Sequence, residues 1–327
     1  MLAMVRDAIR IGSNAAGIAR SKEQFDFIQN AQGIFGKTLA AVFEFGLYGI
    51  LTEELTWTAR TFRGRELDSD VLSRMLKAWI VALHGTLRTP MVRELVRPFE
   101  WLDRHAADFF ARKGRDVPRL GSEATAFVGA LIDNRKNDTL GLAVSFRKKH
   151  SLESLIDSLF LATLKEIGRR WSDNRITVAD EHMASANLQW TAHRFFGNLK
   201  PETPKEISVA VSCVPGDAHA LGAELLSLYL EHRGWSVQFL GATMPEEDML
   251  RLLEARRPQA VVVSVRMVAF LLSFGDLVQH LRQRLPGVRI LAGGPPGVHP
   301  VLSAFCDGVP KNFEECHNLL AEGRNRA

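Results

Sequence analysis

The strongest constraint on the fold is a change of hydrophobic pattern at residues 201–205, PETPK, whose two prolines mark a linker. Beyond it, short apolar runs at 207–214, 236–240, 260–265 and 289–292 predict strands. Helices are expected to begin near Ala218, Pro245 and Phe274. Runs such as AVVV at 260–263 have no polar face, which is typical of strands buried on both sides of a parallel sheet. Residues 201–327 therefore predict a doubly wound, Rossmann-like α/β domain.

The first 117 residues predict an N-terminal helical domain. Apolar residues from Phe43 to Phe62 recur at helical spacing, which predicts one helix. Asp68 is expected to open a second helix, and Pro90 permits the start of a third. Residues 114–118 are predicted to form the boundary of this domain.

Residues 118–200 predict a four-helix bundle. Ser151 is expected to cap a helix that ends near Trp171, and after a polar turn another helix runs through His182. The chain as a whole is thus expected to combine all-α and α/β parts.

Composition excludes several classes of protein. The 46% hydrophobic and 24% charged fractions are those of an ordinary soluble protein, and the formal charge of +4 is scattered rather than gathered into a nucleic-acid patch. Three cysteines, Cys213, Cys306 and Cys316, are too few for a disulfide framework, which favours a reducing compartment. The N-terminus lacks a signal-peptide core, and the apolar stretch 39–51 is too short to span a bilayer. We expect a cytoplasmic protein without membrane contact.

Three motifs stand at predicted strand ends in the C-terminal domain. Asp217, His219 and Gly222 form a D-x-H-x-x-G string, 41 residues separate it from Ser264-Val265-Arg266, and 26 more precede Gly293-Gly294. A loop histidine can offer one ring nitrogen to a metal while a nearby carboxylate holds the other N–H. Glycines and a serine at the ends of parallel strands leave room for a ligand and a hydroxyl to bind it.

This constellation resembles the cobalamin-binding domain, whose pattern is D-x-H-x-x-G, S-x-L and G-G at similar spacings. The resemblance implies that His219 is the lower cobalt ligand and Asp217 its partner. Ser264 would bind the displaced dimethylbenzimidazole tail, with Gly222, Gly293 and Gly294 lining its slot. The family's leucine is Arg266 here, so the wall of the tail pocket differs, and this arginine is long enough to reach a phosphate of the tail.

A second motif closes the predicted bundle. Trp171, nine further residues and Glu181-His182 resemble the W-x₉-E-H signature of light-sensing cobalamin repressors that hold adenosylcobalamin. The resemblance implies that Trp171 covers the adenosyl group, Glu181 binds its ribose, and His182 and Val178 lie against it. The histidine that follows the tryptophan in those repressors is Ser172 here, which puts bis-histidine capture of cobalt in doubt. No winged-helix pattern is visible in the N-terminal region, so no direct DNA-binding domain is predicted.

The layout is also similar to that of the photocobilins, which bind adenosylcobalamin and a bilin. Biliverdin is therefore a second candidate cofactor. None of the cysteines lies in residues 1–200, so a bilin there would be held noncovalently in an aromatic cleft. No residue is assigned to that role.

The leading hypothesis is an adenosylcobalamin light sensor rather than an enzyme, with output through a protein partner, self-association or the N-terminal domain itself. One alternative is a corrinoid methyl carrier of a methyltransferase system, which shares the lower-face residues but needs no ribose ligand such as Glu181. Another is a light-insensitive, cobalamin-dependent anti-repressor of transcription.

Overall fold

The computed structural model describes residues 21–87, 91–112, 120–205 and 207–322. The chain divides into two compact units, each described by itself. One comprises Met1–Pro118 with Arg169–Ile176, and the other comprises Arg119–Gly168 with Thr177–Ala327.

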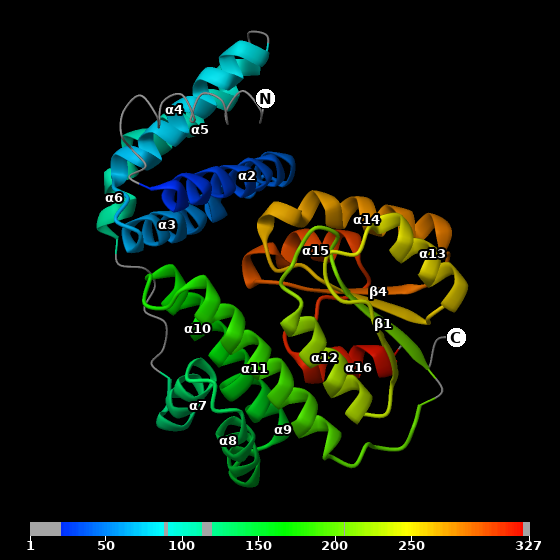
Figure 1. Cartoon of the computed structure of the whole chain (residues 1–327). Coiled ribbons are helices and arrows are strands. Elements are labelled where there is room, and N and C mark those ends of the chain that lie inside the picture. The colour runs from blue at the N-terminus through cyan, green and yellow to red at the C-terminus, as the bar shows by residue number, and fades with distance from the viewer. Residues whose placement is uncertain (1–20, 88–90, 113–119, 206, 323–327) are drawn as a thin grey trace. The chain divides into compact units, whose positions relative to one another are not determined.

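Helices build the described part of the first unit (Figure 1). They are α2 (Lys22–Phe45), α3 (Tyr48–Gly64), α4 (Ser69–Thr86), α5 (Met91–Arg104) and α6 (Ala106–Ala111). The prediction of one helix from Phe43 to Phe62 was wrong, because Gly46 takes a left-handed φ of 67° and ends α2. The predicted cap of α4 is confirmed, since the Asp68 side chain accepts from the backbone of Asp70 and Val71. The predicted boundary at 114–118 and the start at Pro90 lie outside the described residues.

The aromatic residues of this unit pack among themselves. Trp79 is buried and donates its indole N–H to Gln32 Oε1 at 2.7 Å. Trp101 stacks on His105 with ring centroids 4.3 Å apart. Trp79 is thus part of the helix core, whereas Trp101 is 42% exposed.

The second unit begins with a helical bundle, except that the end of α10, residues 169–172, belongs to the first unit. Its helices are α7 (Ser122–Ile132), α8 (Lys136–Lys149), α9 (Leu152–Ser154), the π-helix η1 (Leu155–Leu161), α10 (Ala162–Ser172) and α11 (Val178–Gly197). The predicted cap by Ser151 is confirmed, with its hydroxyl accepting from Ser154 N at 3.1 Å. The helix it opens is not uniformly α, because η1 is a π-helix, whose hydrogen bonds join residues five apart. The buried residues of η1 are Leu155, Ile156, Leu159 and Phe160.

A four-stranded parallel sheet follows, as predicted. Its strands are β1 (Ser208–Cys213), β2 (Ser236–Phe239), β3 (Ala260–Ser264) and β4 (Arg289–Gly293), in the order β2-β1-β3-β4. The helices are α12 (Leu221–His232), α13 (Glu246–Arg256), η2 (Val268–Phe270), α14 (Leu271–Arg284), η3 (Pro296–Val298), α15 (His299–Phe305) and α16 (Phe313–Glu322). Figure 1 shows α12 and α16 on one face of the sheet and α13 and α14 on the other. The predicted doubly wound, Rossmann-like fold is confirmed.

The strand order sets the place of a ligand. The chain runs from β1 outward to β2 and then returns past β1 to β3, so the order reverses between β1 and β3. Open parallel sheets bind ligands in the crevice at the carboxyl ends of strands that flank such a switch point.

The linker 201–205 is tied to the turn between α12 and β2. Glu202 N donates to His232 O at 2.8 Å and Lys205 N to Gly234 O at 2.7 Å. Gly234 has a φ of 84°, and a Cβ there would lie 2.3 Å from Thr203 O. The bundle and the sheet consequently form one compact unit.

No helix among the described residues is both long and apolar enough to cross a membrane.

Candidate functional site

A tight turn after β1 positions the D-x-H-x-x-G string. Asp217 N donates to Val214 O at 3.1 Å, with Pro215 and Gly216 as the two central residues. Gly216 has a φ of 89°, so this is a type II turn, which needs glycine at the third position. A Cβ on Gly216 would also lie 3.1 Å from Phe270. The turn directs residues 217–219 across the carboxyl end of β1.

Asp217 orients the imidazole of His219. The Asp217 Oδ1 atom lies 2.6 Å from His219 Nδ1 and accepts from His219 N at 3.0 Å. An ionised carboxylate only accepts, so the proton is on Nδ1 and the Nε2 lone pair is exposed. Nε2 has no partner among the described residues, and the side chain of His219 is 57% exposed. The ring is thus held in the tautomer that binds a metal through Nε2.

The second oxygen of Asp217 joins β1 to β3. Asp217 Oδ2 accepts from the backbone N–H of Arg266 at 3.0 Å, while the arginine side chain is exposed. Burial of Asp217 acts to raise its pKa, but the hydrogen bonds from His219 and Arg266 outweigh that effect and the pKa is lowered. The carboxylate therefore stays ionised at neutral pH.

Ser264 and Gly293 lie side by side at the ends of their strands. They are register partners across β3 and β4, and the half-buried Ser264 has no side-chain hydrogen bond among the described residues. Backbone bonds from Val214 to Ser264 and from Val265 to Gly293 bring all three motifs to one edge of the sheet.

The three predicted glycines have different surroundings. A Cβ on Gly222, in the first turn of α12, or on Gly293 would meet nothing within 4 Å. At Gly294 it would lie 2.7 Å from Val265 O. The open space at Gly222 and Gly293 can take a ligand, whereas glycine at 294 is already required by the packing of the fold.

Glu181 and His182 meet in the first turns of α11. Their side chains pair at 2.6 Å between Glu181 Oε2 and His182 Nδ1, and Ser185 donates to Glu181 Oε1 at 3.1 Å. A capping box of Thr177 and Asp180 begins the helix. Val178, at the first position of the helix, is 53% exposed. This end of α11 thus presents an apolar and a charged group to solvent.

Trp171 belongs to the other compact unit, with the N-terminal helices. Its indole stacks on Trp57, with ring centroids 6.2 Å apart and planes at 28°. The following residue, Ser172, is buried and donates its hydroxyl to Arg169 O at 2.8 Å.

Helix α11 is anchored to the helix that follows His219. Gln189 Nε2 donates to both carboxylate oxygens of Glu224 on α12, at 2.8 and 2.9 Å. His193 Nε2 lies 2.7 Å from Glu224 Oε1, and the Glu224 side chain is only 10% exposed. This polar cluster links the helix with Glu181 and His182 to the helix that begins beside the His219 loop.

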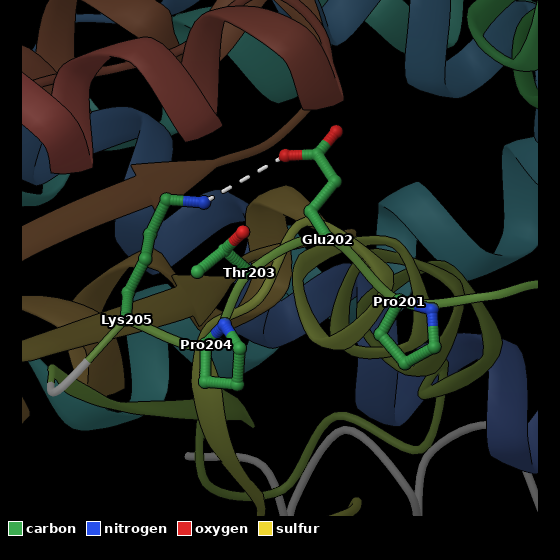
Figure 2. A pocket seen from close by; sticks show the side chains of 5 residues that line it. All are labelled: Pro201, Glu202, Thr203, Pro204 and Lys205. Atoms are coloured by element: carbon green, nitrogen blue, oxygen red, sulfur yellow. Dashed lines mark ion pairs between the residues drawn. The ribbon is translucent and has the colours of Figure 1, made fainter.

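The linker lines a hollow of about 620 Å³ (Figure 2). Figure 2 shows Lys205 paired with Glu202, at 3.8 Å, beside Pro201, Thr203 and Pro204. None of the predicted site residues lines this hollow, which is lined by the linker residues 201–205. We assign no function to it.

Sequence reasoning missed two parts of this arrangement. The turn at Pro215-Gly216 has a local signal, the Pro-Gly dipeptide at the end of a predicted strand. Glu224 has no such signal, because a glutamate in an apolar helix becomes significant only when Gln189 and His193 are known to face it.

The described residues contain no group of three or more His, Cys, Asp or Glu side chains that could hold a metal ion. A single imidazole at a sheet edge binds a metal firmly only if the other ligands arrive with it. The imidazole of His219 is a single oriented donor, of the kind that would suit a metal brought in with its own ligands.

The structure combines a helical bundle with a doubly wound parallel sheet, and the predicted motifs of the C-terminal domain lie at the switch point of that sheet. Residues 207–309 match a family model described as the B12 binding domain, and residues 124–189 match a second model with the same description. The chain is therefore a cobalamin-binding protein.

Similar proteins include a transcriptional repressor and corrinoid proteins. The HTH-type transcriptional repressor CarH of Myxococcus xanthus is 31% identical over 140 residues, which cover 42% of this chain and 46% of that protein. The chain thus spans about half the length of this relative. The trimethylamine corrinoid protein of Methanosarcina barkeri is 24% identical over 204 residues, 61% of this chain and 89% of that protein. The solved monomethylamine corrinoid protein of M. barkeri shares the fold, with a TM-score of 0.50 and 18% identity over 60% of this chain and 96% of its own.

Proposed function

We propose that this protein is an adenosylcobalamin-binding light sensor. The observation that carries the proposal is the imidazole of His219, oriented by Asp217 and exposed at the switch point beside Ser264 and two open glycines. The similarity to a CarH repressor and the W-x₉-E-H signature favour a sensory role over other uses of cobalamin.

In this proposal the lower-face residues bind and orient. His219 would hold the cobalt through Nε2, and Asp217 holds the Nδ1 proton that leaves Nε2 free to do so. The Ser264 hydroxyl would bind the displaced dimethylbenzimidazole tail, with Gly222, Gly293 and Gly294 leaving the slot for it. Arg266, whose side chain is exposed, would bind a phosphate of the tail. When bound, adenosylcobalamin supplies a cobalt–carbon bond that light can break.

The upper-face roles follow the resemblance residue by residue. Glu181 would exchange its hydrogen bond with Ser185 for the ribose hydroxyls, with His182 and Val178 close by. Trp171 would cover the adenosyl group and exclude water. Ser172 cannot replace a histidine as a cobalt ligand, so we expect no bis-histidine state through that position.

The output is proposed to be a change in how the bundle docks on the sheet. A ligand that contacts both α11 and the loop before α12 stabilises the docked arrangement, and its loss shifts the balance toward release. The cluster of Gln189, His193 and Glu224 is the contact that this shift acts on. Release would then change binding to a protein partner or to a second copy of the chain.

A corrinoid methyl carrier is the second candidate, favoured by the match to 89% of the trimethylamine corrinoid protein. A methyl carrier must uncover cobalt and needs no ribose ligand. A third candidate, a light-insensitive anti-repressor, predicts binding to a transcription factor without any spectral response.

The deciding experiment is the absorption spectrum of the adenosylcobalamin-loaded protein in the dark and after green light. We expect a stable photoproduct that free cobalamin does not give, faster loss of the adenosyl group in Trp171→Ala, and loss of protein ligation to cobalt in His219→Ala. Asp276→Ala, an exposed carboxylate on α14, is the matched control. An unchanged spectrum after light, together with acceptance of a methyl group, would favour the carrier.

Biliverdin is proposed as a second cofactor on layout alone. Loading the same protein with biliverdin and illuminating it with red light tests this. A bound bilin gives a red-shifted band that co-purifies with the protein, and free biliverdin alone in the filtrate contradicts the proposal.

A further inference from the structure

One face of α3 contacts the turn that carries Trp171. Trp57, Arg60 and Gly64 are spaced three and four residues apart, so they share this face. All three meet residues of the segment Arg169–Ile176, which belongs to the same compact unit as the N-terminal helices.

Arg60 binds the turn through two hydrogen bonds to Asp173. Its Nε donates to Asp173 Oδ1 at 2.5 Å and its NH2 group to Oδ2 at 2.7 Å, a two-point contact. Arg169 adds a bond to Oδ2 at 3.0 Å. The hydrogen bond from Arg60 is the main cause that lowers the pKa of Asp173, against the opposing effect of burial. Because the contact is bidentate and mostly buried, it defines an orientation as well as a distance.

Arg65 holds the indole itself. Its guanidinium carbon lies 4.5 Å from the ring centroid of Trp171 and 4.3 Å from that of Phe27, so one cation contacts two rings. Its NH1 group also donates to Thr61 O at 3.1 Å. The cation–π contact and the hydrogen bond together fix Arg65 beside the Trp171 ring.

Gly64 allows the close approach. A Cβ there would lie 2.7 Å from Ser172 O and 3.0 Å from the carbonyl carbon of Asp173. Both atoms belong to the backbone and cannot turn away. Any larger residue at position 64 would push the turn off α3.

We propose that Arg60 and Arg65 are positioning residues for Trp171, so that the N-terminal helical domain sets the orientation of this indole. The role of Trp171 toward the adenosyl group rests on the function proposed above. The position of the Trp171 ring does not rest on that function, because its contacts with Trp57 and Arg65 lie within the N-terminal unit.

The first arm of the test needs no cofactor. Stacked indoles give a coupled near-ultraviolet circular dichroism band, which Trp57→Phe and Trp171→Phe identify in the full-length protein. We expect Arg60→Ala and Asp173→Asn to reduce that band to less than about half, because the two-point contact orients the turn. Arg60→Lys keeps the charge but loses the two-point hydrogen bonding of the guanidinium, so its band should be intermediate between those of the wild type and Arg60→Ala. Arg63→Ala, an exposed arginine of the same helix, is the control.

The second arm measures loss of the adenosyl group in the dark. Arg60→Ala and Asp173→Asn should accelerate it about fivefold, in the direction of Trp171→Ala, as small misplacements of a positioned group do. Far-ultraviolet circular dichroism checks folding, and the nearly isosteric Asp173→Asn remains informative if Arg60→Ala is unstable. An indole band equal to that of the Arg63→Ala control in both variants overturns the proposal. A reduced band with unchanged adenosyl loss supports the positioning and removes the capping role of Trp171 from the proposed function.

Discussion

Asp217 uses both carboxylate oxygens within the site, one for His219 and one for the backbone of Arg266. Any residue except proline at position 266 can donate that backbone bond, so the change from the family's leucine to arginine leaves this support of Asp217 intact. Because the pKa of Asp217 is lowered in the folded protein, its ionised carboxylate stabilises the fold. This stabilisation is fully present above the ordinary pKa of about 4 and is lost as the pH falls through the lower pKa of the folded state.

Two glycines next to His219 should respond differently to substitution. Gly222→Leu places a side chain in open space on a helix, where it adds no strain. We expect unchanged stability but weaker cobalamin binding, by about tenfold or more, because the added side chain fills the slot. Isothermal titration of cobalamin measures this.

Gly216→Ala is the matched contrast. It forces a side chain onto a φ of 89° and against Phe270, and should lower the free energy of unfolding by about 1–3 kcal/mol. Denaturant titration of both variants separates the effects. Normal cobalamin affinity in Gly222→Leu would contradict the placement of the ligand beside α12.

At the level of elements, the buried carboxylate of Glu224 on α12 links that helix to α11. Glu224 accepts from Gln189 and pairs with His193, and the helices that carry these residues bear the proposed upper-face and lower-face groups. Isolated helices of this length are marginal in water, so contacts between them decide whether the bundle stays on the sheet.

Glu224→Ala should lower the free energy of unfolding by about 2 kcal/mol, because Gln189 loses both acceptors and a charged hydrogen bond is removed. Thermal and urea unfolding measure it. Combined with Gln189→Ala, the loss should be less than the sum of the two single losses, since the two residues share one interaction. Strictly additive losses would show that Glu224 does not couple α11 to α12.

Across the whole molecule, bundle and sheet form one compact unit, whereas the turn with Trp171 belongs with the N-terminal helices. Chain order alone would assign this turn to the bundle. The unit that carries Trp171 is therefore built from two separate segments of the chain, Met1–Pro118 and Arg169–Ile176.

Cobalamin should stabilise the folded protein by mass action. At a free concentration one hundred times Kd, we expect about 2.7 kcal/mol of added stability. Hydrogen exchange should localise the protection to the peptides that contain Asp217, Ser264 and Gly293. Protection confined to other peptides, or equal stabilisation of His219→Ala, would contradict the site.

Much of the fold follows from local pattern. The four strands, the caps at Asp68 and Ser151 and the switch from helix to sheet after residue 200 were predicted and are confirmed. The break at Gly46 was missed, because apolar spacing continues across it and only the left-handed backbone ends the helix. The π-helix at Leu155–Leu161 was also missed, since hydrophobic periodicity does not distinguish it from an α-helix.

By itself the sequence determined which residues are candidates, because motif spacing and hydrophobic period are properties of neighbouring residues. His219 and Asp217 are two positions apart, and their contact is nearly local. The tertiary structure alone decided that Asp217 binds the backbone of a residue 49 positions away and that Arg60 grips Asp173 across 113 positions. Such contacts exist only after the sheet and helices have packed, and no local preference encodes them.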